Sequence, residues 1–418
     1  MSSTSSRRHA CTKVLSNKRF WWERSERIAP IFFGAQDFFQ ESNLPEVIIW
    51  RTFPLYSGEE VFVANVEIYF ITNRNYLPEN KRAVFGPHFN PDGVAALRFG
   101  KAVYNVEGRN ASFEDIHVYP DAKVMAGETT VPPAGSGSFL DDLRGEMRQG
   151  RDTLIFIHGY NVSFTEALKA GALLAAGLPQ DINLVVFSWP SDGTAVPYMS
   201  YYSDREDARA SGPALARAYL KLFDFVKTLR ETEVRNRTAA GADPVEAAAE
   251  TELCERCIHV LAHSMGNYVL RHGVQAIKAK DPRKIVRMFD QVILAAADED
   301  DDTFEFESKL RDLPILSRRV TVYHNHRDRA LLISDRTKSN PDRLGSEGPR
   351  MLDMLPKKVV IVDCSRVAAI ADPRVLHSYY IRSPAVTADI NAVLDDSPDD
   401  LIGNREVVRA ARAYRLAS

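Results

Sequence analysis

Cysteine is scarce in this chain, and so are long apolar runs and an excess of charge of either sign. Four cysteines among 418 residues do not make the disulfide framework of a small secreted domain. No apolar run approaches the roughly 20 residues that a membrane-spanning helix needs. The formal net charge is −3 and the isoelectric point is near 6.4, which gives no reason to expect a nucleic-acid partner.

The amino-terminal residues also lack the apolar core of a secretion signal, although they are rich in serine, arginine and lysine. We therefore expect a soluble, cytoplasmic protein. Hydrophobic residues make up 45% and charged residues 26%, as in ordinary globular chains, and there is no internal repeat. The length suits an N-terminal arm or extension over residues 1–58 and one large domain over residues 59–418.

A metal site has little support in the sequence. Cys254 and Cys257 form a C-x-x-C pair near His259, which could be half of a zinc site. No second C-x-x-C or H-x₃-H motif follows it. We therefore predict no metal, and we interpret the pair as small residues at a junction between a helix and a strand.

Strand and helix patterns alternate along most of the chain. The Gly/Pro/Ser-rich stretch at residues 131–138 predicts a loop. A lid-like insertion is expected over residues 189–210 and a polar helical insertion over residues 231–252. This alternation predicts a mostly parallel, doubly wound sheet with helices on both faces. The predicted strands are residues 61–72, 97–106, 153–157, 183–189, 257–263, 291–297, 319–323 and 358–363. The predicted helices are residues 139–148, 163–177, 211–230, one directly after residue 264 and a last one from Pro384.

The segment at residues 257–267 is the most informative in the chain. An apolar, β-branched run stops at Ser264, which lies between small residues and is followed at once by a helical pattern. Strand, sharp turn and helix form the nucleophile-elbow signature, with Ala262 in place of the usual first glycine. We expect a strained serine backbone and flanking residues small enough to avoid clashes. An ordinary tight turn would use the same residue types.

A His-Gly turn follows the first buried parallel strand, at residues 158–161. In parallel sheets, functional groups gather at the carboxyl ends of the strands. The backbone N–H of Tyr160 or Asn161 can therefore join that of Met265, at a helix N-terminus, to form an oxyanion hole. The alternative is a purely structural turn in which Ser163 caps the next helix.

Acid and base candidates follow the last two predicted strands. The chain order Ser264, Asp328, His377 is that of α/β-hydrolases. Serine is a poor nucleophile at neutral pH, so a histidine must take its proton and an aspartate must orient the imidazole. Asp298, at the end of the preceding strand, is the alternative acid. The neighbouring aspartates could instead form a solvated loop and helix cap, or hold a cation.

Aromatic and histidine side chains near these strand ends are candidates for substrate contact. Trp189 and Tyr202 belong to the lid-like insertion, and aromatic groups suit an apolar acyl pocket. His158 and His263 lie directly beside the two turns. We predict substrate contacts for all four, with packing inside a loop as the alternative for the aromatic residues.

With these residues in view, the chain resembles a bacterial family of α/β-hydrolases of unknown function with esterase- or lipase-like character. The resemblance spans roughly residues 61–395. It rests on residues 155–164, 187–191, 202–205, 262–267, 328–331 and 377–379.

The resemblance implies a serine hydrolase whose catalytic triad is Ser264, Asp328 and His377. We expect it to cleave a small-molecule or lipid-like carboxylic ester through an acyl-enzyme, with neither a metal nor an organic cofactor. The same triad would also serve an acyltransferase, a thioesterase or an amidase, because the acceptor is chosen by pocket shape and water access. A non-catalytic binding module on a hydrolase scaffold is a further alternative.

Overall fold

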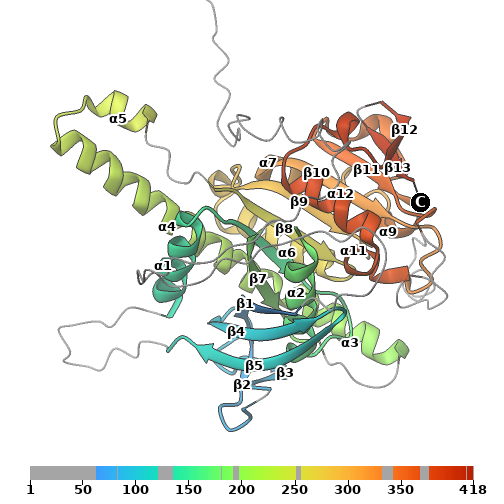
Figure 1. Cartoon of the computed structure of the whole chain (residues 1–418), viewed down its shortest axis with the longest axis horizontal. Helices are drawn as coiled ribbons and strands as arrows, with labels where there is room; N and C mark the ends of the chain where they lie inside the picture. The colour runs from blue at the N-terminus through green and yellow to red at the C-terminus, as the bar shows by residue number, and fades with distance from the viewer. Residues whose placement is uncertain are drawn as a thin grey trace, which may run out of the picture. The chain divides into compact units, whose positions relative to one another are not determined.

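A sheet of 11 strands organises the part of the chain that the computed structural model describes (Figure 1). The predicted arm at residues 1–58 lies outside the described residues. The account below concerns the compact unit Phe62–Ser418 by itself. The described residues are 63–81, 83–120, 135–179, 181–191, 197–250, 256–331, 342–367, 376–410 and 412–417.

The sheet is parallel through its centre and antiparallel at its edges. The strand order is β12-β13-β11-β10-β9-β8-β6-β7-β1-β4-β5. β4 is antiparallel to both β1 and β5, β12 is antiparallel to β13, and the other pairs are parallel. The strands are β1 (Val63–Thr72), β4 (Arg98–Glu107), β5 (Asn110–Val118), β6 (Asp152–Ile157), β7 (Ile182–Ser188), β8 (Ile258–His263), β9 (Phe289–Ala295), β10 (Ser317–His324), β11 (Val359–Asp363), β12 (Arg405–Arg409) and β13 (Ala413–Leu416), with β2 (Arg74–Tyr76) and β3 (Phe85–Phe89) in a separate pair.

Burial on both faces explains the apolar runs that marked the central strands. Every residue of β7 is buried, as expected for a parallel strand covered by helices on each side. All eight predicted strands are present, and the predicted doubly wound sheet is confirmed. The strands that the sequence did not reveal are β2, β3, β5, β12 and β13. They are short or lie at a sheet edge, where polar and exposed residues hide the pattern.

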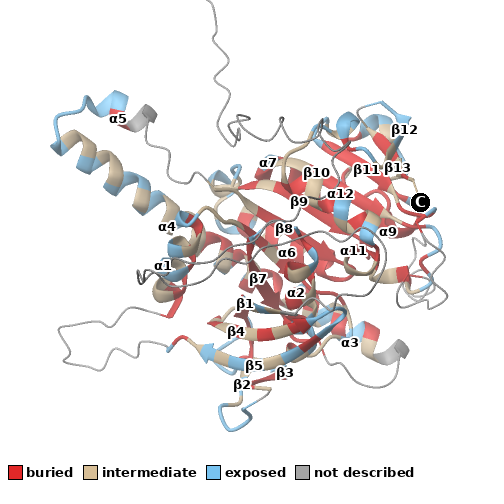
Figure 2. Cartoon of the chain, viewed as in Figure 1, coloured by how far each residue is buried: buried red, intermediate tan, exposed pale blue. Residues whose placement is uncertain are grey.

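Helices cover both faces of the sheet (Figure 2). α1, α4 and α6 share one apolar core with the sheet, and α2, α11 and α12 share the other. Among the described residues, no helix combines the length and the apolar character needed to cross a bilayer. The helices are α1 (Gly135–Arg148), α2 (Phe164–Gly177), α3 (Pro197–Ala210), α4 (Gly212–Ala239), α5 (Pro244–Glu250), α6 (Gly266–Lys280), α7 (Leu313–Leu316), α9 (Leu344–Glu347), α11 (Tyr379–Arg382) and α12 (Pro384–Leu394), with short 3₁₀ turns η1 (Pro282–Lys284), η2 (Leu352–Met354) and η3 (Asp399–Leu401).

The long helix α4 extends beyond its predicted end at residue 230. It continues to Ala239 and α5 follows, so these two helices make up most of the predicted polar insertion at residues 231–252. Ion pairs one turn apart, such as Lys227–Glu231, stabilise a helix that has lost its apolar stripe. The prediction of the end was wrong because apolar periodicity, on which it depended, stops before the helix does.

Two other helices, α1 and α3, occupy parts of the predicted loop and of the predicted lid-like insertion. α1 begins at Gly135, inside the predicted loop at residues 131–138. A side chain at Gly135 would lie 2.9 Å from the carbonyl oxygen of Pro120, so glycine here serves a close contact. α3 occupies much of the segment at residues 189–210.

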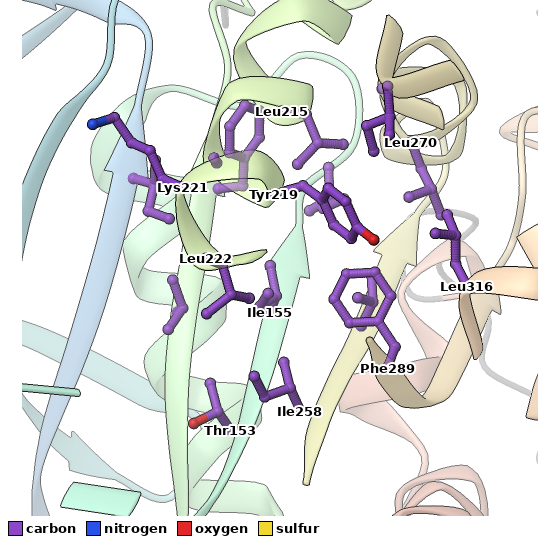
Figure 3. A pocket seen from close by; sticks show the side chains of 18 of the residues that line it. Thr153, Ile155, Leu215, Tyr219, Lys221, Leu222, Ile258, Leu270, Phe289 and Leu316 are labelled. Atoms are coloured by element: carbon purple, nitrogen blue, oxygen red, sulfur yellow. The ribbon is translucent and has the colours of Figure 1, made fainter. Parts of the chain in front are cut away.

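A small apolar pocket lies between the sheet and α1, α4 and α6 (Figure 3). Its volume is about 70 Å³. An apolar cavity stays dry, so the side chains around it lose packing contacts without gaining hydrogen bonds to water. Residues that line it include Ile155, Leu215, Tyr219, Val260, Leu270 and Phe289.

Val260→Ile should stabilise the protein because the added methyl group enters this pocket. We expect a gain of about 0.5–1 kcal/mol in the free energy of unfolding, measured by urea denaturation. Val292 pairs with Val260 in the sheet and is equally buried, but it does not line the pocket. Val292→Ile should therefore cost about 1–3 kcal/mol through overpacking. Equal shifts of the same sign in both variants would contradict this assignment of the free volume.

Candidate active site

Ser264 lies at the turn between β8 and α6, in a left-handed backbone conformation with φ of 52°. This region is uncommon for a residue with a side chain and costs about 1–3 kcal/mol. The predicted strained backbone at this serine is therefore confirmed. The N–H of Ser264 donates to the carbonyl of Ala295 at 3.0 Å, and its carbonyl accepts from the N–H of Asp298 at 3.2 Å. These bonds attach the turn to the end of β9.

Small residues around the turn are required by its close contact with β6. A Cβ at Gly266 would lie 2.5 Å from the carbonyl oxygen of Ile157 and 2.6 Å from that of His158. A Cβ at Gly159 would lie 2.9 Å from the Cβ of Ser264. Real Cβ atoms do not come so close to other heavy atoms, which confirms the predicted steric reason for the small residues.

His377 and Asp328, which are 49 residues apart in the sequence, are brought together in the structure. His377 Nδ1 lies 2.7 Å from Asp328 Oδ2, and Asp328 is buried at 2% exposure. The other carboxylate oxygen of Asp328 accepts from the N–H of Ala330 at 3.0 Å. Because Nδ1 donates to the carboxylate, Nε2 of the neutral imidazole is left with its lone pair.

Opposing effects set the pKa of His377. Burial by itself disfavours the imidazolium and would lower the pKa. The charge of Asp328 and the hydrogen bond to it favour the imidazolium, and Asp298 adds a smaller contribution of the same sign. The attraction wins, so the pKa of His377 is raised above its ordinary value.

Asp298 is close to this pair but holds a different partner. Its carboxylate accepts from the hydroxyl of Tyr201 at 2.7 Å and lies 3.8 Å from Nε of Arg343. The hydrogen bond from His377 Nδ1 goes to Asp328 instead. Of the two acids considered from the sequence, the structure therefore brings Asp328 to the histidine.

The rest of the aspartate run is largely shielded from solvent, and Asp300 and Asp302 are ion-paired, so the alternative of a solvated loop is wrong. Asp301 and Asp302 are 7% and 8% exposed. Lys309 contacts both Asp300 and Asp302, and Asp300 also contacts Arg343. These cations neutralise carboxylates that burial would otherwise penalise.

His263 links the serine turn to His377. Its Nε2–H donates to the carbonyl oxygen of His377 at 3.0 Å, and the two rings lie 4.7 Å apart. Burial and the neighbouring His377 lower the pKa of His263 well below its ordinary value, so it stays neutral. His263 was predicted to contact substrate, and the structure places it against His377.

Tyr379 attaches the same segment to the sheet. Its hydroxyl donates to the carbonyl of Tyr323, at the end of β10, at 2.8 Å. It also accepts from the N–H of Ala296, just after β9, at 2.9 Å. His377, two residues earlier, is thus held beside the carboxyl ends of the strands that lead to Asp298 and Asp328.

The three predicted oxyanion-hole donors have different environments. Met265 is buried at the N-terminal end of α6, and its N–H makes no hydrogen bond to the described residues. Tyr160 lies in the loop after β6, and its hydroxyl is 2.6 Å from that of Ser200. Asn161 does not fit the prediction because its N–H already donates to the Asp204 carboxylate at 3.1 Å. The sequence could not show this contact between positions 43 residues apart.

The predicted substrate contacts of His158 and Trp189 are replaced by contacts with each other. Both are buried, and their rings stack 5.2 Å apart. Trp189 donates from its backbone N–H to His158 Nε2 at 3.2 Å, and from its indole to the His158 carbonyl at 2.9 Å. Burial, with the nearby charge of Arg74, lowers the pKa of His158 to about 3. This pair therefore packs beneath the loop that follows β6. Tyr202, in contrast, is exposed and lies beside Tyr201.

The described residues of the possible half zinc site, Cys257 and His259, have other bonding partners. Cys254 lies outside the described residues, and Cys257 is disulfide-bonded. His259 is buried, accepts from the N–H of Gln291 at 3.3 Å and lies 3.6 Å from Asp152. Within the described ranges, no three His, Cys, Asp or Glu side chains gather as metal ligands would.

Two buried charged residues near the site were given no role from the sequence. Arg74 is 1% exposed and Asp204 is 0% exposed. The signal for Arg74 was a charged residue directly after a β-rich run, where burial of a cation requires several acceptors. Asp204 lies in one of the segments on which the family resemblance rests, residues 202–205, but nothing in that segment indicated its partners.

Comparison with known proteins agrees with the fold described above. The model of a family described as "Alpha/beta hydrolase of unknown function (DUF900)" matches residues 137–236 and 240–405, more than half of the chain. The uncharacterized protein alr1448 of Nostoc sp. is 28% identical over 149 residues. That match covers 30% of this chain and 31% of the relative, so the two are alike over about a third of their lengths. The resemblance expected from the motifs is confirmed.

Gly266→Ala should disrupt the elbow, because the new methyl group would meet two carbonyl oxygens of the β6 end. We expect a loss of about 1–3 kcal/mol in the free energy of unfolding, measured by urea denaturation. Gly137→Ala, in α1, is the matched control: no atom lies within 4 Å of its new Cβ, and helix formation is favoured. If both variants were equally stable, the proposed crowding at Gly266 would be wrong.

Proposed function

We propose that this chain, which belongs to the family of α/β-hydrolases of unknown function, is a serine hydrolase that cleaves carboxylic esters. The observation that carries the proposal is the 2.7 Å hydrogen bond between His377 and Asp328. It lies beside a serine at φ of 52°, since His263, the residue before Ser264, contacts the His377 ring. A buried histidine and carboxylate next to a strained serine suit nucleophilic catalysis.

In the proposed reaction, Ser264 Oγ attacks the ester carbonyl while Nε2 of His377 takes the hydroxyl proton. Asp328 holds the imidazole with Nδ1 protonated and stabilises the imidazolium. The C–O bond to the alcohol then breaks, and His377 returns the proton to the departing alkoxide. In the second half of the reaction, His377 takes a proton from water, and the water oxygen attacks the carbonyl of the acyl-enzyme. The bond to Ser264 Oγ then breaks, His377 returns the proton to Ser264, and the carboxylic acid leaves.

The oxyanion formed at each attack needs hydrogen-bond donors. The Met265 N–H supplies one at the start of α6, where the helix dipole also favours negative charge. We assign the second donor to the Tyr160 N–H, since the N–H of Asn161 already donates to the Asp204 carboxylate. The aromatic rings of Tyr160 and Tyr201, 5.7 Å apart, favour a small-molecule or lipid-like ester over a strongly polar substrate.

Ser264→Ala should abolish labelling by a fluorophosphonate probe, because the probe reacts only with an activated serine. We expect one adduct by intact mass on the wild type and none on the variant. Hydrolysis of p-nitrophenyl butyrate should fall by about 10³–10⁶-fold. Ser317→Ala removes an equally buried serine in β10 and should keep both signals. A folded wild type that takes no probe would favour a binding module on this scaffold.

Asp328→Asn should move the pH profile as well as the rate. In the wild type, kcat/KM should rise as neutral His377 forms, with a midpoint above the ordinary imidazole value of 6.5. Removing the Asp328 charge leaves burial in control, so the midpoint should shift to lower pH. The plateau should fall by about 10⁴-fold, because the imidazole loses its tautomeric control.

Asp298→Asn is the comparison that separates the two acids. It removes only the smaller electrostatic contribution to His377, so the midpoint should fall slightly. The plateau should stay within about tenfold of the wild type, since Asp298 holds Tyr201 rather than the histidine. A collapse in Asp298→Asn with little loss in Asp328→Asn would reverse the assignment of the acid.

A further inference from the structure

Arg74 is a buried cation that reaches two loops of the candidate site from a strand that precedes the matched family segments. It begins β2 and is 1% exposed. Its guanidinium donates to the carbonyl oxygens of Val162 at 2.8 Å and Ser191 at 3.3 Å. Its Nε donates to Ser188 Oγ at 3.0 Å. One side chain therefore joins β2 to the segments that follow both β6 and β7.

Asp204, which carries the opposite charge, contacts the same two loops. This fully buried carboxylate, on α3, accepts from the N–H of Asn161 at 3.1 Å and from the hydroxyl of Ser191. The Ser191 hydroxyl oxygen in turn accepts from the N–H of Val162 at 3.2 Å. Carbonyl oxygens of the loops thus contact the Arg74 cation, and N–H groups contact the Asp204 carboxylate or its Ser191 partner. Each peptide dipole therefore has its favourable orientation toward the charge.

The start of the same loop is held through Ser188. Its hydroxyl lies 3.4 Å from Nε2 of His158, and Nδ1 of His158 donates to the carbonyl of Gly159 at 2.9 Å. Residues before and after Tyr160 are therefore attached to buried polar groups. Asn161, immediately after Tyr160, is kept at a left-handed φ of 57°. Such a conformation persists only where surrounding contacts enforce it.

We propose that Arg74 and Asp204 are positioning residues for the oxyanion hole, which hold the loop at residues 158–162 so that the Tyr160 N–H faces the reacting carbonyl. The inference rests on the proposed function. An oxyanion donor is effective only at about 2.7–3.1 Å from the developing charge, so a loop displaced by about 1 Å loses much of the effect. Neither side chain touches substrate in this role.

In this role Arg74 contributes to catalysis from outside the matched family segments, which begin at residue 137. Removing either charge leaves its buried partner groups without hydrogen bonds, and the loop must move to satisfy them with water. β2, which precedes α1, is then needed for catalysis as well as for stability, because it supplies Arg74.

The test compares Arg74→Gln and Asp204→Asn with Arg405→Gln in the full chain. Arg405 begins β12, far along the sheet from the loop, and its side chain is 1% exposed and paired with Asp389 at 2.7 Å. Active sites are counted by fluorophosphonate titration, and p-nitrophenyl butyrate is the substrate. We expect kcat per active site to fall about 10–100-fold in the first two variants, with KM within about threefold. Arg405→Gln should lose stability but keep kcat per active site.

Binding of an inhibitor that mimics the tetrahedral intermediate should change only if these residues act on the oxyanion hole, and not if their role is purely structural. The inhibition constant of an alkyl trifluoromethyl ketone should rise in parallel with the fall in kcat/KM for Arg74→Gln, because both depend on the oxyanion donors. Arg74→Lys keeps the charge without the forked geometry and should recover part of kcat. If Arg74→Gln fails to fold, Arg74→Lys and the near-isosteric Asp204→Asn replace it in the same measurements.

Three results would overturn the inference while leaving the proposed function intact. The first is wild-type kcat per active site in Arg74→Gln and Asp204→Asn, and the second is an equal loss in Arg405→Gln. Unchanged binding of the trifluoromethyl ketone despite lower kcat would also overturn it. A wild type with neither probe labelling nor ester turnover is a different failure, because it removes the proposed function and this inference with it.

Discussion

The close contact between the Ser264 turn and the end of β6 is the constraint on which the rest of the site depends. A Cβ at Gly266 would lie 2.5 Å from a backbone carbonyl oxygen, so no larger residue can occupy that position without moving β6 or α6. The contact places Ser264 in a left-handed conformation and directs the N-terminus of α6 toward the same region. The strain is maintained because β6, β8 and β9 are buried, adjacent and hydrogen-bonded on both sides.

Around that turn, buried charges are tolerated because each meets its complement. Burial opposes the imidazolium of His377, but the Asp328 carboxylate outweighs it, whereas His263 and His158 have no such partner and stay neutral. The proposed base and the two neighbouring histidines thus differ by environment rather than by residue type. The same principle places Arg74 and Asp204 on either side of the loop after β6, where carbonyl oxygens and N–H groups separate them.

Much of the central fold and the turn at Ser264 were predictable from local patterns. Fully buried parallel strands leave continuous apolar runs, and an elbow leaves a serine among small residues, because both depend on steric requirements of adjacent positions. The edge strands β5 and β12 were missed because one or both of their faces meet solvent. Asn161 was predicted wrongly because its N–H is bound by Asp204, which is distant in sequence. The site role of Ser264, Asp328 and His377 stays a prediction until a labelled serine or a pH profile tests it.

The sequence by itself determined the alternation of strands and helices, the elbow at Ser264 and the order of the candidate serine, acid and base. Each of these depends on residue size, apolar periodicity or position along the chain. Only the tertiary structure decided that Asp328 rather than Asp298 meets His377, that His158 and Trp189 stack against each other, and that Arg74 reaches the loop after β6. The physical reason is that hydrogen bonds and ion pairs are directional and act over a few ångströms, so partners separated by tens of residues are chosen by the packing of the sheet and its helices.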